Sequence, residues 1–182
     1  MSKLTIMVFG LGLCLAHSSA MAQARKPSDP QIAHIAYTAG QIDIETAELA
    51  LKRSRNKEVR AFATDMVRDH KAVNAQALSL VKKLNVKPED NDTSRALLKQ
   101  ADAGRKQLSS LKGAAFDKAY AQGEVAFHQQ VNDAVQNTLI PSATNGELKD
   151  LLATGLRIFQ GHQQHAEQLV RALSGQAGAS LQ

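Results

Sequence analysis

Apolar residues recur every three or four positions along most of this chain, which is the spacing of one face of an α-helix. No segment alternates apolar and polar residues as a half-buried strand would. The pattern predicts four long helices, separated at a turn through Asn56, a Pro-containing loop at 88–92 and a turn after Pro141. A less regular helical stretch, from about Thr93 to Leu111, lies between the second and third of them.

Residues with known roles at helix ends indicate where these segments begin and end. We predict that Asp29 caps the first helix, with Pro30 at the first helical position, where a missing N–H costs nothing. Pro141 is predicted to stop the third helix, and Thr144 and Glu147 have the spacing of a capping box for the fourth. Short turns within two pairs of helices and a long connection between the pairs predict an all-α, ferritin-like four-helix bundle. Its two helical hairpins are joined by a long crossover that contains a connecting helix.

The N-terminal residues have the features of a secretory signal peptide. A basic start at Lys3 precedes an apolar run that is too short for a membrane anchor. Ala20-Met21-Ala22 is a cleavage site that would leave Gln23 first, and a second A-x-A sequence ends at Ala24. We therefore predict a signal peptide at 1–22, a flexible segment at 23–29, a bundle at 30–173 and a disordered, Gly- and Ser-containing tail at 174–182. This organisation predicts a periplasmic protein.

Composition narrows the classes of partner. Cys14 is the only cysteine, so the mature chain has no thiol and forms no disulfide, and Leu13 before it argues against lipidation. Loss of Lys3 lowers the formal net charge from +5 to +4, and the basic residues are spread along the chain. With no Trp, this composition argues against nucleic-acid binding. No second apolar run could anchor the mature chain, but peripheral contact with the outer membrane stays open, and no partner is indicated.

Each long helix places ionisable residues where its apolar stripe should continue. Six candidate metal ligands share this property: Asp43, Asp69, His70, Glu124, His128 and His162. Counting from the two predicted turns, at about 1.5 Å of rise per residue, places Asp43 level with His70 and Glu124 level with His162. Each hairpin is thus expected to bring an acid opposite a histidine.

Buried charges are costly unless they are paired or bound to a metal. Carboxylates and imidazoles together are ligands for Fe, Zn, Mn or Cu. The alternative is that the acid–histidine pairs are hydrogen-bonded within the core and only fix the helix register. Glu124 and His128 are four residues apart rather than three, so a di-iron oxidase or peroxide-scavenging enzyme is less favoured. With no phosphate loop or nucleophile motif either, no catalytic residue is assigned.

The same residues resemble the bacterial family called domain of unknown function 4142. Residues 59–70 (VRAFATDMVRDH) are similar to its first signature, and residues 116–120 (FDKAY), followed by His128, are similar to its second. The resemblance extends over about 30–173 and implies a ferritin-like fold and export. Asp43 and Arg157 depart from it, since the family usually carries Glu and Pro there. Residues and resemblance together predict an exported bundle, with or without a bound metal, that serves in envelope stress or metal handling.

Overall fold

The computed structural model describes residues 26–179, so the predicted signal peptide lies outside the described residues. Within this range the chain forms helices and no strand. The elements in chain order are α1 (Asp29–Arg53), α2 (Lys57–Lys83), α3 (Asp92–Ser109), α4 (Gly113–Ala134), the π-helical segment η1 (Val135–Leu139), α5 (Ile140–Ser142) and α6 (Gly146–Ala179).

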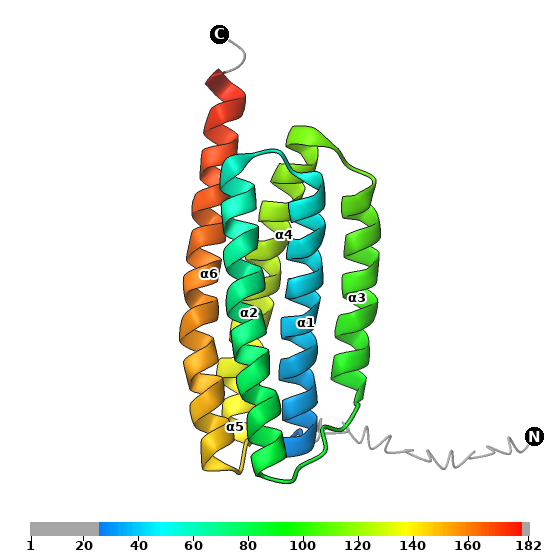
Figure 1. Ribbon diagram of the computed structural model, residues 1–182, viewed down its shortest axis with the longest axis vertical. Coiled ribbons are helices and arrows are strands. Elements are labelled where there is room, and N and C mark those ends of the chain that lie inside the picture. The colour runs from blue at the N-terminus through cyan, green and yellow to red at the C-terminus, as the bar shows by residue number, and fades with distance from the viewer. Residues whose placement is uncertain (1–25, 180–182) are drawn as a thin grey trace, which may run out of the picture.

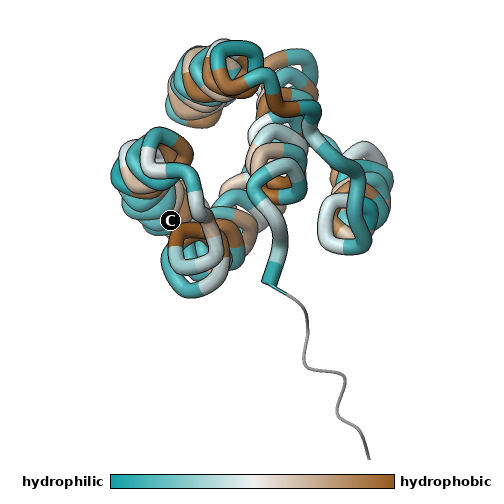
Figure 2. The backbone as a smooth tube through the Cα atoms, turned by 90° about the horizontal axis from the view of Figure 1, so that it is seen from below, coloured by the Kyte–Doolittle hydropathy of each residue, from teal (hydrophilic) through white to brown (hydrophobic). Residues whose placement is uncertain are grey.

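The helices form the predicted all-α, ferritin-like bundle of two hairpins. α1 packs against α2, α4 packs against α6, and α2 also packs along α6 (Figure 1). α2 and α4 run in the same direction, so the end of α2 and the start of α4 lie at opposite ends of the bundle (Figure 1). The chain must therefore travel the length of the bundle between the hairpins. α3 makes this crossover, beside α1 and α4 and outside the four-helix core (Figure 2).

Two of the predicted helix caps are wrong. Ser28, rather than Asp29, caps α1, in a reciprocal capping box with Gln31. Asp29 instead accepts three hydrogen bonds, two from Thr144 and one from the Asn145 N–H. Thr144 is therefore not the cap of α6, and Asn145 accepts from the Leu148 N–H in that role. The pattern of neighbouring residues could not show this, because Asp29 and Thr144 satisfy one another across 115 positions of sequence.

Three boundaries also differ from the prediction. α2 ends at Lys83, and Asn85 follows with a positive φ of 51°, a left-handed conformation common after helices. Pro141 does not stop the third helix, because the π-helical turn of η1 precedes it and α5 continues to Ser142. A wider turn accommodates the proline ring and its missing N–H. α6 continues beyond Leu173, where the bundle was predicted to end.

The interior consists of two apolar clusters with a polar layer between them. Towards the α1–α2 turn, one cluster contains Val59, Phe62, Met66, Phe116, Tyr120 and Leu169. Towards α5, the other contains Ile32, Ile35, Val135, Leu139, Leu148 and Leu152. Asp43, His70, Glu124, His128 and His162 fall between these two sets along the four long helices, whereas the buried Asp117 lies next to Phe116 on α4. No helix within residues 26–179 is long and apolar enough to cross a membrane.

Close contact between α1 and α2 sets the position of this polar layer. Gly40 lies one turn before Asp43, and Asn74 lies one turn after His70. A Cβ atom on Gly40 would collide with the Asn74 side-chain amide, which is buried and donates to the Tyr37 carbonyl at 3.5 Å. The absence of a side chain at Gly40 therefore allows Asp43 and His70 to face one another at short range.

We predict that Gly40→Ala destabilises the protein by about 1–3 kcal/mol, because the added methyl overpacks the α1–α2 contact. Gly104→Ala is the matched control, since nothing lies within 4 Å of a Cβ atom there. Removing a helical glycine at that exposed position should stabilise the protein by about 0.5–1 kcal/mol. Urea unfolding followed by circular dichroism measures both, and equal effects of the two substitutions would contradict the proposed contact.

Candidate metal centre

Five ionisable side chains from four helices form the polar layer. α1 contributes Asp43, α2 contributes His70, α4 contributes Glu124 and His128, and α6 contributes His162. All five are between 1 and 6 % exposed. Groups of this kind are almost never so buried unless they are paired or bound to a metal. Their contacts therefore decide what the layer can do.

Asp43 contacts two histidines. Its Oδ2 atom lies 3.0 Å from Nε2 of His70 and 3.4 Å from Nε2 of His128. Neither contact has hydrogen-bond geometry, and both carboxylate oxygens lack such a partner within the described residues. Burial would raise the pKa of Asp43, but the neighbouring His70 and His128 outweigh burial and hold the pKa below its usual 3.8. Asp43 is therefore an ionised carboxylate in the middle of the bundle.

Glu124 has the opposite tendency. Burial and, secondly, the charge of Asp43 raise the pKa of Glu124 well above its usual 4.5, which favours the neutral acid. Burial and the same two carboxyl groups raise the pKa of the Tyr120 hydroxyl, one turn away, so Tyr120 stays protonated. The two acids of the site are thus unlike, with one negative charge held mainly on Asp43.

The ring of His128 is oriented by its own helix. Its Nδ1 lies 3.0 Å from the Glu124 backbone carbonyl, which can only accept, so Nδ1 carries the proton. Nε2 then has the free electron pair, and it has no hydrogen-bond partner in the described part of the chain. Burial lowers the pKa of His128 despite the opposing effect of Asp43, so the ring is neutral at pH 7. A neutral imidazole with a free Nε2 is in the form that binds a metal.

His162 is oriented by Asp69 on the neighbouring helix. Nε2 of His162 lies 3.0 Å from Oδ2 of Asp69, whose carboxylate also accepts from Arg68 at 2.7 and 3.0 Å. These hydrogen bonds, from Arg68 first, keep the pKa of Asp69 low, so the carboxylate accepts and Nε2 of His162 donates. Nδ1 of His162 is left with a free electron pair and no partner among residues 26–179. Burial lowers the pKa of His162 to about 4, so it too is neutral at pH 7.

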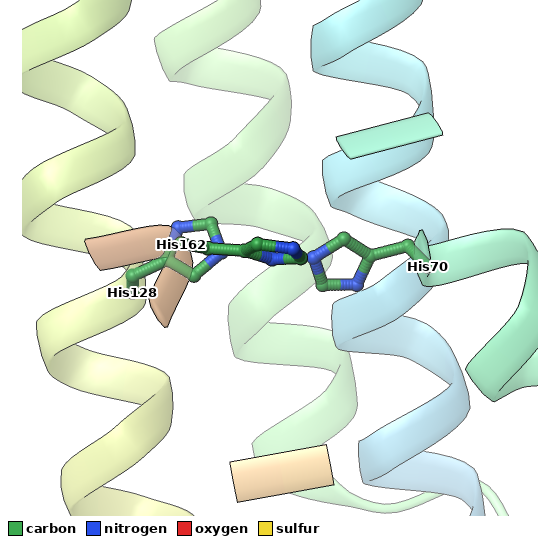
Figure 3. Close-up of side chains that lie close together, drawn as sticks. All are labelled: His70, His128 and His162. Carbon is green, nitrogen blue, oxygen red and sulfur yellow. The ribbon is translucent and has the colours of Figure 1, made fainter. Parts of the chain in front are cut away.

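The three histidine rings converge. Figure 3 shows His70, His128 and His162 extending from three helices toward a common point. Their ring centroids are 5.2–5.7 Å apart. One ring nitrogen from each lies within 4.8 Å of the others, and Asp43, Glu124 and His128 form a second group at the same spacing. Phe159 stacks on His70 with centroids 4.8 Å apart and planes 4° from parallel, so it covers this ring on one face.

These residues fit a transition metal ion. The three imidazoles of one group, and the imidazole with two carboxyl groups of the other, are ligand types typical of such sites. Asp69 and the Glu124 carbonyl hold the outward nitrogens of two rings, which is how outer partners fix the tautomer of metal-binding histidines. The potential ligand atoms inside the cluster have no hydrogen bond among residues 26–179. They are both ring nitrogens of His70, Nε2 of His128, Nδ1 of His162 and both carboxylate oxygens of Asp43. A polar core built only for hydrogen bonding would leave fewer of them unsatisfied.

The structure brings five of the six predicted ligands into the two groups and leaves Asp69 outside them. It brings Asp43 next to His70, as the count of residues from the turn predicts. It does not pair Glu124 with His162, because Glu124 groups with Asp43 and His128. Side chains lean toward the N-terminus of their own helix, so on antiparallel helices His128 and His162 lean toward each other, which the count ignores. Asp69 lies outside both groups, half-buried, and holds His162.

Sequence reasoning missed Phe159 as a cover for His70, and it missed two buried asparagines, Asn74 and Asn132. Asn74 and Asn132 follow His70 and His128 by four residues. A polar side chain one turn beyond each of these two histidines was therefore visible in the sequence as an interruption of the apolar stripe. Phe159 carried no signal that distinguished it from an ordinary core residue.

Comparisons with known proteins identify the family. The model of domain of unknown function 4142 (DUF4142) matches residues 15–169. This chain belongs to the DUF4142 family. No curated protein sequence matches it. Among solved structures it is similar to CopM in the Cu(II)-bound form, with a TM-score of 0.62 and 14 % identity, over 81 % of this chain and 99 % of that one. It is also similar to a DUF305 protein from Streptomyces coelicolor, with a TM-score of 0.59 and 17 % identity, over 79 % and 87 % of the two chains. At such identities the DUF4142 chain shares the fold with these helical bundles.

The lowered pKa of His162 predicts a pH dependence of stability in the metal-free DUF4142 protein. Between its usual pKa of 6.5 and about 4, His162 binds a proton in the unfolded chain but not in the folded one. The stability that the neutral His162 ring contributes to the folded protein is therefore complete above pH 6.5 and is lost as the pH falls toward 4. We expect the stability of the unmodified protein, relative to His162→Gln, to decrease from pH 7 to pH 4. Chemical unfolding in the presence of a chelator measures this difference.

His165→Gln is the control for this measurement. His165 is an exposed histidine one turn further along α6, where its ring packs edge-on against Phe62 at 5.0 Å. Replacing it should leave the pH profile close to that of the unmodified protein. An equally flat profile for the unmodified protein and His162→Gln would contradict the assignment.

Proposed function

We propose that this DUF4142 protein is exported to the periplasm and binds one transition metal ion between its helices, as part of metal handling in the cell envelope. His70, His128 and His162 would be the nitrogen ligands and Asp43 the carboxylate ligand. Glu124 and Asp69 would act beside them, Glu124 next to Asp43 and Asp69 behind His162. A bound ion would supply a positive charge next to the Asp43 carboxylate.

The observation that carries this proposal is the orientation of two of the histidines. His128 and His162 each donate a hydrogen bond from one ring nitrogen to an oxygen acceptor outside the cluster. The other ring nitrogen of each lies inside the cluster and has no hydrogen-bond partner among the described residues. Ligand orientation of this kind lowers the entropy cost of binding, because the rings need not reorder. The lowered pKa values of both rings add to this, since no proton has to be displaced at pH 7.

The donor set bears on which metal is bound. Imidazole suits Cu, Zn and Fe, whereas Mn prefers carboxylate and water oxygens, so a site with three imidazoles and one carboxylate disfavours Mn. Among divalent ions Cu²⁺ forms the tightest complexes with nitrogen ligands. The structural neighbour CopM was solved with Cu(II), which supports copper as the first ion to test. Zn²⁺, with its preference for four ligands, is the second.

A metal-free structural protein is the second candidate function. Two of the contacts already join helices without an ion, Asp43 with His70 between α1 and α2, and Asp69 with His162 between α2 and α6. In that case the polar layer would only fix which helices meet and at what height. Such a protein would gain no stability from Cu²⁺ or Zn²⁺, because only a ligand of the folded state raises the melting temperature.

Titration with Cu²⁺ and Zn²⁺ tests the proposal. We expect one ion per mature chain and a melting temperature that rises with the free metal concentration. At a free metal concentration of 100 times Kd, the free energy of unfolding should increase by about 2.7 kcal/mol. His128→Gln should abolish stoichiometric binding. Asp69→Asn should weaken binding by about 10- to 100-fold, because it removes only the group that orients His162. Isothermal calorimetry and elemental analysis after gel filtration measure both effects.

His165→Gln is again the matched control, as an exposed histidine outside the cluster, and it should bind the metal like the unmodified protein. Circular dichroism separates loss of the site from loss of the fold in each variant. A metal-replete preparation without stoichiometric metal, or binding that is lost equally with His165→Gln, would rule out this site.

Export is tested separately. Expression of the full chain in a Gram-negative host should release a mature protein that begins at Gln23, because signal peptidase cleaves after the small residue Ala22. Intact mass spectrometry of the periplasmic fraction measures this. An Ala20→Asp substitution, which removes one small residue of the first A-x-A site, should abolish cleavage after Ala22 and leave only cleavage after Ala24, at the second A-x-A sequence. Recovery of uncleaved chain in the cytoplasm from the unmodified gene would contradict export.

A further inference from the structure

A cavity of about 410 Å³ connects the site with the side of the bundle that α3 covers. It lies between α1, α3 and α4, and it is partly open to solvent. Asp43, Tyr120 and Glu124 are at its inner end, and α3 forms its outer wall with residues that include Gly104 and Arg105. α3 packs on α1 and α4 outside the four-helix core (Figures 1 and 2), and the cavity lies between these three helices.

The inner end of the cavity presents unpartnered oxygen atoms. Both carboxylate oxygens of Asp43, Oε2 of Glu124 and the hydroxyl of Tyr120 are buried, and none has a hydrogen bond within residues 26–179. These three residues are 1–3 % exposed. Oxygen atoms that converge without partners, one of them on an ionised carboxylate, are suited to receive a cation.

The outer end carries a net negative charge. Arg105 lies between two carboxylates, with Nη1 3.3 Å from Oε2 of Glu45 and Nη2 2.6 Å from Oδ1 of Asp102. Arg105 lines the cavity and the two acids flank it, so this group of three side chains has a net charge of −1, which attracts cations. Four exposed glutamines also line the cavity, namely Gln100, Gln107, Gln122 and Gln130, and the Gln100 amide donates to Oε1 of Gln130 at 3.1 Å. Amide oxygens are ligands that can replace water around a cation.

The other approaches to the histidine cluster are less suited to an ion. The two ends of the bundle are filled by the apolar clusters. A second cavity, of about 600 Å³, reaches Phe159, but none of the five ionisable residues of the polar layer lines it. Between α2 and α6, the Asp69 carboxylate already accepts hydrogen bonds from Arg68 and lies 3.0 Å from Nε2 of His162, so it is not free to receive a cation.

We propose that the cavity between α1, α3 and α4 is the route by which a hydrated divalent cation reaches the histidine cluster. Glu124 and Asp43 are the first buried protein ligands that the ion meets on this route. The inference rests on the proposed metal-binding function and adds the path and the residues that control it. A route affects how fast an ion enters and leaves, whereas the cluster determines how tightly it is held.

Filling the cavity tests the route. The substitution Gly104→Trp places a large ring at the α3 wall, where nothing lies within 4 Å of a Cβ atom, so the backbone need not move. Gly161→Trp is the matched control, because Gly161 is also an exposed helical glycine with open space but does not line the cavity. Stopped-flow absorbance follows Cu²⁺ association, and chelator competition follows its release.

We expect Gly104→Trp to slow association and release alike, by tenfold or more, with Kd unchanged within twofold. Gly161→Trp should match the unmodified protein in both rates. Removal of charge at the entrance gives a second measurement that introduces no bulk. Glu45→Gln with Asp102→Asn should slow association several-fold at low salt, and the difference should disappear at high salt. Asp150→Asn, an exposed acid on α6, is its control.

The outcomes distinguish the route from the site. If the unmodified protein binds Cu²⁺ and Gly104→Trp binds it at the control rate, the route is wrong and the metal site stands. A change in Kd that comes from release alone, with association at the control rate, would also overturn the route. If the unmodified protein binds neither Cu²⁺ nor Zn²⁺, the proposed function fails and the route fails with it.

Discussion

The ionised carboxylate of Asp43 is the group on which the organisation of the bundle depends. A charge this deeply buried costs several kcal/mol unless neighbouring groups compensate it, and removal of a compensating partner is costlier than removal of the pair. His70 on α2 and His128 on α4 contact this carboxylate at 3.0 and 3.4 Å. α1, α2 and α4 are therefore constrained in rotation and height by one side chain. The close α1–α2 contact at Gly40 serves this constraint, since a wider separation would part Asp43 from His70.

A metal-free core and a metal site make different demands on the same residues. A core that only satisfies polar groups should turn each hydrogen-bonding atom toward a partner. Here the partners lie on the outside of the cluster, at Asp69 and at the Glu124 carbonyl, while the inward atoms of His128, His162 and Asp43 remain unpartnered. The unlike pKa shifts of Asp43 and Glu124 place one negative charge beside three imidazoles. This arrangement resembles a ligand set that is oriented in advance more than it resembles a closed hydrogen-bond network.

Periodicity was sufficient to predict the helices, their pairing and the residues of the polar layer. It identified Asp43, His70, Glu124, His128 and His162 because each interrupts an apolar stripe, and it placed Asp43 correctly against His70. Contacts between distant segments and the directions of side chains were beyond its reach. Asp29 caps nothing on its own helix because its oxygens are used by Thr144 and Asn145. A count of residues along the axis represents helices as rods, so it paired Glu124 rather than His128 with His162.

The connecting helix shows how a weak sequence signal can mark an element that packs outside the core. α3 was predicted from an irregular stripe interrupted by Gly104, and only Ser94 and Leu108 of its residues are buried. Such a helix contributes little to the core, and its role in the topology is to connect the end of α2 with the start of α4. Because it lies outside the four-helix core, it leaves a space against α1 and α4 that a fully interdigitated fifth helix would fill. An exchangeable ion must pass through the wall of a bundle whose ends are apolar. The irregularity that made α3 a poor core helix is therefore compatible with a wall that admits an ion.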